Sequence, residues 1–341
     1  MKVLMIKLSA FGDLIHCLPA LDDVLARDDV DEVHWLVDER FAFVTAVFPE
    51  QVTIHRVALK GKHPLRAAWQ AIRMLRQEKF DWVIDLQSLI KSSLIAAALG
   101  SKVVGFDARE IREKPATWLQ RSTRFQTDDR HVVQKYRRVA AEPWRQPHAA
   151  YPLLAYVEPL IHRDMCEHLD AVLLDGLPDQ PWVVLSLGGS WQTKELPDAT
   201  WRDLITGMQN MGTHAIICWG HAEEQEKAAR IAQGTSATVL PERLGMQALC
   251  ALLLQADVLV ATDTGVLHLA AALQRPTVSF WGPSASWRSG PLGERHCFVE
   301  SNPACGPCFK RQCANFVCMD MIRAEEMIAG LEQVGEGESG G

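Results

Sequence analysis

The sequence predicts an α/β protein with two doubly wound domains, each a parallel sheet covered by helices. Three observations support this fold class. Apolar runs of strand length recur along the 341 residues, and helix-period stretches separate them. The runs are apolar throughout rather than alternating, which is typical of sheets buried on both faces. A proline-rich stretch then divides the pattern into two halves of similar size.

In the first half, five apolar runs are expected to form strands. They cover residues 2–8, 33–37, 53–57, 81–86 and 102–105. Stretches 64–78 and 88–99 have the helical period. Pro64 is suited to open the first of these helices, because the first turn of a helix does not need its backbone N–H.

The second half repeats the alternation. Its expected strands cover 182–187, 214–219, 237–240, 258–262 and 277–281, and its expected helices cover 198–211, 222–233 and 246–256. Asp198 carries a helix-start signal. A last amphipathic helix at 322–334 precedes the tail Gly-Glu-Gly-Glu-Ser-Gly-Gly, which we expect to be disordered.

The stretch 142–181 interrupts this rhythm with six prolines and one expected helix near 158–173. We therefore place the boundary there and predict domains at 1–160 and 161–341. In doubly wound folds, ligands bind outside the carboxyl ends of the strands. With two such domains facing each other, the expected site is the cleft between them.

Composition narrows the function classes. The net charge of −7 argues against a general nucleic-acid binder. No apolar run is long enough to span a bilayer, and the N-terminus is too short for a signal-peptide core. We therefore expect a cytosolic chain whose nine cysteines are mostly reduced.

The segment ATDTGVLHLAAAL, 261–273, gathers polar groups where an expected strand meets a helix. Gly265 at a helix N-terminus would let an anion approach free N–H groups. Asp263 is better suited to cap the helix or to accept from sugar hydroxyls, and His268 lies one turn further. The alternative is an ordinary N-cap followed by a core histidine.

Two further strand ends carry candidate chemistry. In LSLGGSWQTKELP, 185–197, two glycines, Ser190 and Lys194 suit a phosphate, although a glycine turn with a solvated lysine is the simpler alternative. In KLSAFGDLIHCLPAL, 7–21, a turn leads to Asp13, which opens a helix that carries His16. Asp13 could be a general base for an acceptor hydroxyl or only a first-turn acid.

The absence of four motifs argues against the reaction classes that depend on them. The chain has no G-x-x-x-x-G-K-[ST] loop, no G-x-S-x-G elbow and no H-E-x-x-H helix. No G-x-G-x-x-G follows the first strand, which argues against a dinucleotide-dependent dehydrogenase.

Several segments, in order and spacing, resemble the bacterial lipopolysaccharide heptosyltransferases of glycosyltransferase family 9. These are KLSAFGDLIHCLPAL at 7–21, VIDLQSLIKSSL at 83–94, REKPA at 112–116, CWGHAEEQE at 218–226, ATDTGVLHLAAAL at 261–273 and VSFWGPS at 278–284. The resemblance departs from the family pattern at Ser88, where a glycine is usual, at Gly189-Ser190, where a threonine pair is usual, and at Leu244, where a methionine is usual.

The resemblance implies a GT-B fold, in which two Rossmann-like domains face each other across a cleft. It implies an inverting enzyme that moves L-glycero-D-manno-heptose from ADP-heptose to the Kdo region of the lipopolysaccharide inner core. The N-terminal domain would bind the acceptor and the C-terminal domain the ADP-sugar. No metal or other cofactor would be needed, and the enzyme would work in the cytoplasm, peripherally at the inner face of the inner membrane.

The resemblance also implies site residues. Asp13 would be the catalytic base. The donor would be bound by Gly189, Ser190, Lys194, Glu224, Leu244, Asp263, Thr264, Gly265 and His268. The Kdo-lipid A type acceptor would be bound by Lys60, Lys62, Arg66, Arg112 and His131.

Two questions stay open at this point. A nucleotide-sugar epimerase of the same architecture and a two-domain sugar-binding protein are alternative functions. Cys305, Cys308, Cys313 and Cys318 have the spacing C-x₂-C-x₄-C-x₄-C, which is compatible with a structural metal, with reduced thiols or with disulfides.

Overall fold

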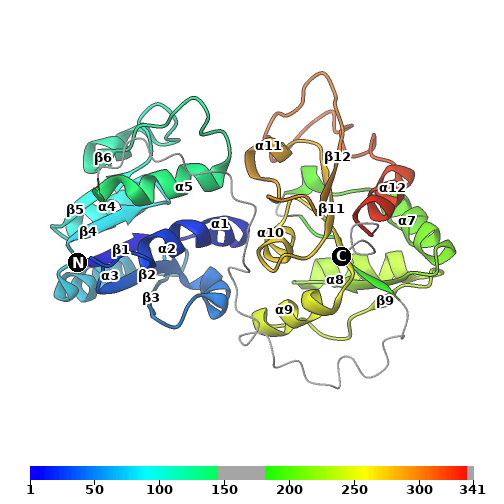
Figure 1. Ribbon diagram of the computed structural model, residues 1–341, viewed down its shortest axis with the longest axis horizontal. Coiled ribbons are helices and arrows are strands. Elements are labelled where there is room, and N and C mark those ends of the chain that lie inside the picture. The colour runs from blue at the N-terminus through cyan, green and yellow to red at the C-terminus, as the bar shows by residue number, and fades with distance from the viewer. Residues whose placement is uncertain (145–180, 190, 336–341) are drawn as a thin grey trace. The chain divides into compact units, whose positions relative to one another are not determined.

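The chain forms two compact units, and each contains one six-stranded parallel sheet (Figure 1). The computed structural model describes residues 1–144, 181–189 and 191–335. Its contacts divide the chain into Met1–Leu153 and Leu154–Gly341. The predicted boundary near residue 160, the predicted helix at 158–173 and the last six residues of the predicted tail lie outside the described residues.

The first unit alternates strands and helices from its first residues. Its strands are β1 Lys2–Ile6, β2 Glu32–Asp38, β3 Val52–Val57, β4 Trp82–Asp85, β5 Lys102–Gly105 and β6 Arg121–Ser122. Its helices are α1 Phe11–His16, α2 Leu18–Leu25, α3 Pro64–Glu78, α4 Ile90–Ala98 and α5 Val132–Ala141, with 3₁₀ segments η1 Glu39–Val47, η2 Lys114–Leu119 and η3 Glu142–Trp144.

The second unit repeats the pattern. Its strands are β7 Trp182–Ser186, β8 His214–Cys218, β9 Thr238–Val239, β10 Val258–Thr262, β11 Thr277–Trp281 and β12 His296–Glu300. Its helices are α7 Asp198–Asn210, α8 Ala222–Ala232, α9 Met246–Gln255, α10 Gly265–Ala272, α11 Ser286–Ser289 and α12 Ala324–Gly335, with η5 Gln192–Lys194.

Both sheets have the same strand order. The first runs β3-β2-β1-β4-β5-β6, and the second, read in the same sense, runs β9-β8-β7-β10-β11-β12. In each sheet, successive strands are added first on one side of the first strand and then on the other. The neighbours at this switch point are β1 and β4 in the first sheet and β7 and β10 in the second. The carboxyl ends of two such strands form the crevice where doubly wound folds bind ligands.

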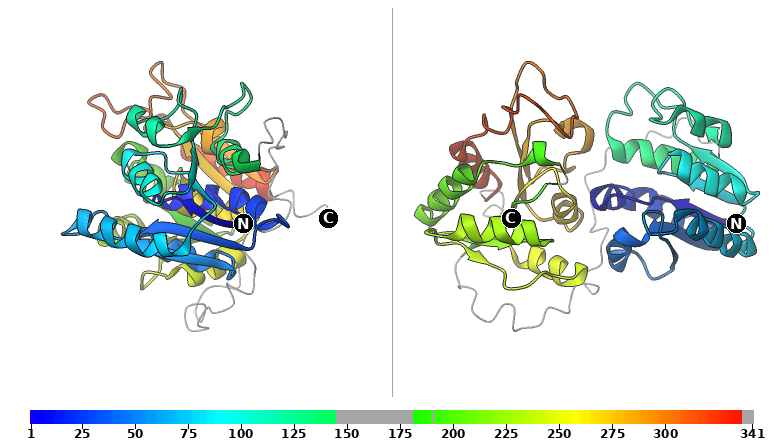
Figure 2. Two further views of the ribbon diagram at one scale, coloured as in Figure 1. Left: turned by 90° about the vertical axis from the view of Figure 1, so that its left-hand side faces the viewer. Right: turned by 180° about the vertical axis from the view of Figure 1, so that it is seen from behind.

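Helices cover both faces of the first sheet (Figure 2). Helix α3 contacts α4, and α4 contacts η2, whereas α2 contacts α5. Crossovers in opposite directions along a sheet place their helices on opposite faces, because each crossover is right-handed. A core that includes Leu4, Ile6, Leu75 and Ile95 lies under the α3 and α4 layer.

The predicted strands and helices that fall on described residues are confirmed to within a few residues, whereas helix α5 and two strands were missed. Strand β6 has only two residues, and β12 lies at a sheet edge with a mostly half-buried or exposed pattern, so neither gives a long apolar run. One start is corrected: α1 begins at Phe11, so Asp13 lies inside its first turn rather than opening it. None of the described helices is long and apolar enough to cross a membrane.

Candidate active site

Asp13 lies at the carboxyl end of β1, in the first turn of α1. Its Oδ1 accepts a hydrogen bond from the Tyr136 hydroxyl at 3.2 Å, and its Oδ2 lies 3.6 Å from Lys7 Nζ. The backbone N–H of Ala10 donates to the same Oδ2 at 3.4 Å. The Asp13 side chain nevertheless stays 43% exposed. A carboxylate that is oriented but accessible has the features of a general base.

Lys7 and Tyr136 form the buried support of this carboxylate. Lys7 is the residue that follows β1, and its Nζ donates to the Tyr136 hydroxyl at 2.7 Å. Because that hydroxyl donates in turn to Asp13, the ammonium, the phenol and the carboxylate form one chain of hydrogen bonds. Sequence reasoning missed both residues, since a lysine at a strand end and a tyrosine 129 positions away show no local pattern.

The turn after β4 holds the Asp13 turn in place. Asp85 is fully buried and accepts from the backbone N–H groups of Gln87 and Ser88 and from the hydroxyls of Ser92 and Ser93. Burial raises the pKa of Asp85, and these four hydrogen bonds oppose that rise. Gln87 Oε1 then accepts from the N–H groups of Leu8 and Ser9, at 3.0 and 3.1 Å.

Ser88 explains one departure from the family pattern. Its φ of 48° lies in the left-handed region, which glycine adopts without cost. The serine hydroxyl donates to the Asp85 carbonyl at 2.9 Å and accepts from the Phe106 N–H at 3.1 Å. These two hydrogen bonds offset the backbone strain, so the turn keeps its shape without glycine.

The predicted acceptor residues differ in exposure. Lys60, Lys62 and Arg66 are exposed before and within α3, and Arg112 is exposed before η2. His131 is buried instead, because its side chain caps α5 by accepting from the Val133 N–H at 3.3 Å. The geometry of His131 is that of a capping residue, and its part in acceptor binding stays a prediction.

In the second unit, the turn after β7 meets the start of α8. A Cβ atom on Gly188 would lie 1.7 Å from Glu224 Oε1, so only glycine lets that carboxylate come so close. Glu224 Oε2 accepts from the Gly220 N–H at 2.7 Å. Two predicted donor segments, 185–197 and 218–226, are thus adjacent; Ser190 lies outside the described residues.

Asp263 is the centre of the second cluster. Its Oδ2 lies 2.6 Å from Lys194 Nζ, and its Oδ1 lies 3.1 Å from His268 Nε2. Burial alone would raise the pKa of Asp263, but the His268 hydrogen bond and the Lys194 charge outweigh it and hold that pKa well below the usual range. The cluster therefore contains a carboxylate that is ionised at neutral pH.

Helix α10 begins as the sequence predicted. Thr264 is the N-cap, its side chain accepts from the Leu267 N–H at 3.4 Å, and Gly265 is the first helical residue. Leu244, the predicted adenine neighbour, is half-buried just before α9. The N-terminus of α10 follows β10 directly, so its first N–H groups lie at the carboxyl end of a central strand, where an anion is favoured.

Three residues of this cluster were not predicted. The Thr262 hydroxyl donates to the Gly188 carbonyl at 3.0 Å and ties the β10 end to the β7 turn. Lys194 Nζ lies 4.4 Å from the centre of the Trp191 ring, and the Arg311 guanidinium lies 5.2 Å from the same ring. Arg311 comes from the cysteine-containing loop, so that loop adds positive charge beside Lys194.

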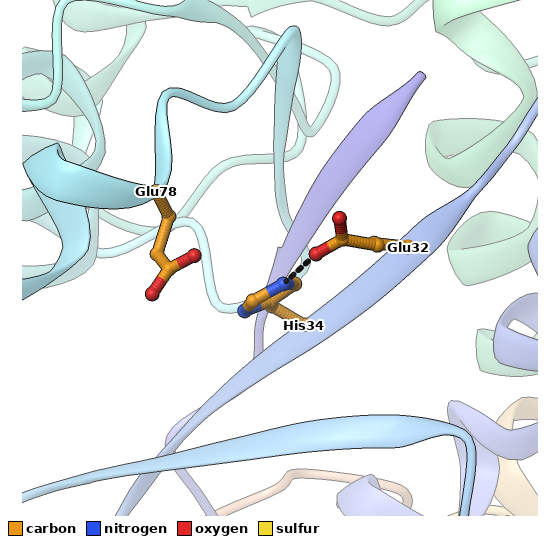
Figure 3. Close-up of side chains that lie close together, drawn as sticks. All are labelled: Glu32, His34 and Glu78. Carbon is orange, nitrogen blue, oxygen red and sulfur yellow. Dashed lines mark hydrogen bonds and ion pairs between the residues drawn. The ribbon is translucent and has the colours of Figure 1, made fainter.

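A possible metal site, Glu32, His34 and Glu78, lies elsewhere in the first unit (Figure 3). Its ligand atoms lie within 4.8 Å of one another, and it is the one such group among the described residues. Lys2 Nζ, however, lies 2.8 Å from a carboxylate oxygen of each glutamate. Because an ammonium already neutralises these carboxylates, we interpret the group as an ion-pair cluster. It lies at the amino ends of β1 and β2, opposite the candidate site.

The four cysteines of the 300–320 loop are free thiols. Cys305 and Cys313 are exposed, and Cys318 is buried. All four lie among the described residues, yet no three of their sulfur atoms come within 4.8 Å of one another. We predict that elemental analysis of the purified protein shows no stoichiometric zinc or iron.

The fold and these clusters define a class of protein. Each unit is doubly wound, and each has its polar groups at the switch point of its sheet. One switch point holds an accessible carboxylate, and the other holds a glycine turn, a lysine and a helix N-terminus suited to an anion. This combination is that of a GT-B glycosyltransferase, in which one domain serves the acceptor and the other a nucleotide-sugar.

Comparison with known proteins identifies the family. Residues 68–317 match the model of glycosyltransferase family 9 (heptosyltransferase). Lipopolysaccharide heptosyltransferase 1 of Pseudomonas aeruginosa is 34% identical over 92% of this chain and 87% of its own length. The chain therefore belongs to glycosyltransferase family 9.

Solved structures agree on the fold. The Escherichia coli heptosyltransferase WaaC with ADP-2-deoxy-2-fluoro heptose is 25% identical, with a TM-score of 0.72 over 97% of this chain and 99% of its own. The family 9 glycosyltransferase of Veillonella parvula is 18% identical, with a TM-score of 0.80 over 98% of this chain and 97% of its own. The predicted family, fold class and enzyme class are confirmed.

Proposed function

We propose that this chain transfers L-glycero-D-manno-heptose from ADP-heptose to the Kdo region of the lipopolysaccharide inner core, with inversion at the anomeric carbon. Family membership and the names of the relatives support the heptosyl transfer. The observation that carries the mechanism is the contrast between an accessible carboxylate, Asp13, and an anion-suited cluster around Lys194.

In this mechanism Asp13 acts as the general base. It takes the proton of the Kdo hydroxyl while that oxygen attacks the anomeric carbon of the heptose. The bond from the anomeric carbon to the diphosphate oxygen breaks, and ADP leaves from the opposite face. Lys7 and Tyr136 keep the carboxylate oriented through the hydrogen bonds described above.

The second unit stabilises the leaving diphosphate. Lys194 and the N–H groups at Thr264 and Gly265 offset the charge that develops on it, so the reaction needs no metal. Asp263 fixes Lys194 and His268 in place, and its remaining lone pairs, together with Glu224, are available to sugar or ribose hydroxyls. Gly189 keeps the backbone close to the ligand, and Leu244 lies beside the adenine.

The acceptor is anionic, whereas the protein has a net charge of −7. We assign the exposed basic residues Lys60, Lys62, Arg66 and Arg112 to the Kdo carboxylates and lipid phosphates, and we assign His131 to the acceptor as well. The acceptor is a lipid, so the enzyme works in the cytoplasm, peripherally at the inner face of the inner membrane.

The test is incubation of the purified protein with ADP-heptose and a Kdo-lipid A acceptor, followed by mass spectrometry of the products. We expect one heptose added to the acceptor and an equal amount of ADP. The epimerase alternative predicts conversion of the sugar nucleotide without acceptor, and a sugar-binding protein predicts no new product. Either of these results would contradict the proposal.

A further inference from the structure

The described part of the chain has four large apolar side chains that are more than half exposed. They are Leu65 (86%), Trp69 (59%), Leu94 (53%) and Trp118 (86%). A single exposed apolar residue is ordinary, but two tryptophans and two leucines at such exposure are not.

These four residues belong to one layer of the first unit. Leu65 and Trp69 lie one turn apart on α3, Leu94 lies on α4 and Trp118 lies in η2. Helix α3 contacts α4, and α4 contacts η2, on the same face of the sheet (Figure 2). We call the outer surface of α3, α4 and η2 the α3–α4–η2 face. The inner side of this layer contributes Ala71, Leu75 and Ile95 to the core. The four exposed residues are therefore not part of the core of the unit.

The charge of the α3–α4–η2 face is strongly positive, although the protein is acidic. Its three segments contain five basic residues, Arg66, Arg73, Arg76, Lys91 and Lys114, and one acidic residue, Glu78. A second acid, Glu113, directly precedes η2 and accepts from the Ile90 N–H at 2.7 Å. Glu78 is already paired with Lys2 at 2.8 Å. Lys60 and Lys62 extend the positive charge before α3. The Arg73 guanidinium lies 5.6 Å from the centre of the Trp69 ring, so a positive charge follows Leu65 and Trp69 on the same row of the helix.

We propose that the α3–α4–η2 face docks this protein on the surface of a bilayer that contains anionic lipids. Tryptophan and leucine enter the boundary between headgroups and acyl chains, while lysine and arginine on the same helices bind the headgroup phosphates. Nucleic acid would use the charge but would leave Leu65 and Leu94 exposed to water.

This inference deepens the proposed function, because it names the surface that meets the membrane. It rests on that function only for its biological setting, since the residues that carry it, apart from Arg66, Lys60 and Lys62, have no part in the proposed reaction. Leu65, Trp69, Leu94, Trp118 and Arg73 can therefore be changed without touching donor, base or acceptor contacts.

The experiment is co-sedimentation of the full-length protein with vesicles that contain no lipopolysaccharide. One set contains phosphatidylglycerol and phosphatidylethanolamine, and the other contains phosphatidylcholine alone. We expect binding to the anionic set only. The double variant Leu65→Gln/Trp69→Gln should bind at least about tenfold more weakly, and Arg73→Gln about fivefold more weakly.

A matched control is Trp287→Gln, which replaces a tryptophan of the second unit that is 50% exposed. It should bind vesicles as the wild type does. The double variant should keep wild-type turnover on a de-acylated, water-soluble acceptor and lose activity only on an acceptor embedded in vesicles. Equal binding to neutral vesicles, unchanged binding by the double variant, or loss of a dimer in that variant on analytical ultracentrifugation would overturn the proposal. Failure of the proposed function would be distinct, since the wild type would then bind vesicles but transfer no heptose to either acceptor.

Discussion

Two carboxylates, Asp13 and Asp263, follow central strands of two sheets with the same strand order, yet they are held differently. Asp13 is 43% exposed and touches Tyr136 and Lys7 at 3.2 and 3.6 Å. Asp263 is 11% exposed and is bound on both oxygens, by Lys194 and His268. The switch points of the two sheets thus hold one accessible carboxylate, which follows β1, and one carboxylate bound on both oxygens, which follows β10.

The difference arises from the partners that the fold supplies. The Lys7 ammonium donates to the Tyr136 hydroxyl and the Leu86 carbonyl, and it lies 3.6 Å from Asp13 Oδ2. Asp13 is therefore only one of its three partners. The Lys194 ammonium donates both to the carboxylate and to the carbonyl of Asp263 itself, at 2.6 and 3.0 Å. A general base has to keep a lone pair free for the proton of its substrate, and the 43% exposure of the Asp13 side chain leaves one accessible.

The largest expected effect is at Asp13. Asp13→Ala should lower turnover by at least about 10²-fold, the usual scale for a positioned base, while the affinity for ADP stays close to that of the wild type. Steady-state kinetics and calorimetric titration of ADP measure the two quantities. Near-normal turnover in a folded variant would remove Asp13 from the mechanism and make the two carboxylates alike.

Removal of the partner of Asp263 should affect stability most. Lys194→Met leaves a buried carboxylate with His268 alone and should lower the free energy of unfolding by about 3 kcal/mol. The matched control is Lys227→Met, because the Lys227 side chain is 9% exposed but its partner Glu195 is 41% exposed and can return to water. In that control, loss of the salt bridge should lower the free energy of unfolding by about 1 kcal/mol or less. Denaturant titration measures the free energy of unfolding of both variants. Equal losses would mean that burial of Asp263 does not make its ion pair more important for stability than the exposed pair.

Titration of Asp263 should contribute to the loss of stability at acid pH. Its pKa is lowered in the folded protein, so its contribution is complete above the unfolded value of about 3.9 and is lost as the pH falls through the folded value. Asp263→Asn removes this contribution. Between about pH 6 and about pH 3, its free energy of unfolding should therefore fall less than that of the wild type. An equally steep acid dependence in both proteins would assign it to other carboxylates.

The smallest effect is expected at Tyr136. Tyr136→Phe removes one hydrogen bond to Asp13, worth about 1 kcal/mol, and should lower kcat about fivefold. Because the phenol acts through the carboxylate, the pH–rate profile should move as well, whereas KM for ADP-heptose should not. A lower kcat with an unchanged pH profile would indicate a purely structural role for the phenol.

Local sequence patterns were sufficient to place many residues of the candidate site at strand ends. The glycines at 188, 189 and 265, the acids at 13 and 263 and the cap at Thr264 all follow apolar runs that are clearly strands, so their position at strand ends could be predicted. Lys7, Tyr136, Trp191, Thr262 and Arg311 could not, because each acquires its role from a partner that the sequence does not place beside it.

The sequence by itself therefore determined the two doubly wound sheets, the strand ends that carry chemistry and, through its motifs, the family. Hydrophobic period and turn residues are local, and they fix secondary structure wherever a strand is buried on both faces. Only the tertiary structure decided which ammonium meets which carboxylate, why Ser88 can replace a glycine, and that Trp69 and Trp118 remain exposed on one layer. Hydrogen bonds and burial depend on distances between segments far apart in the chain, and periodicity contains no information about those distances.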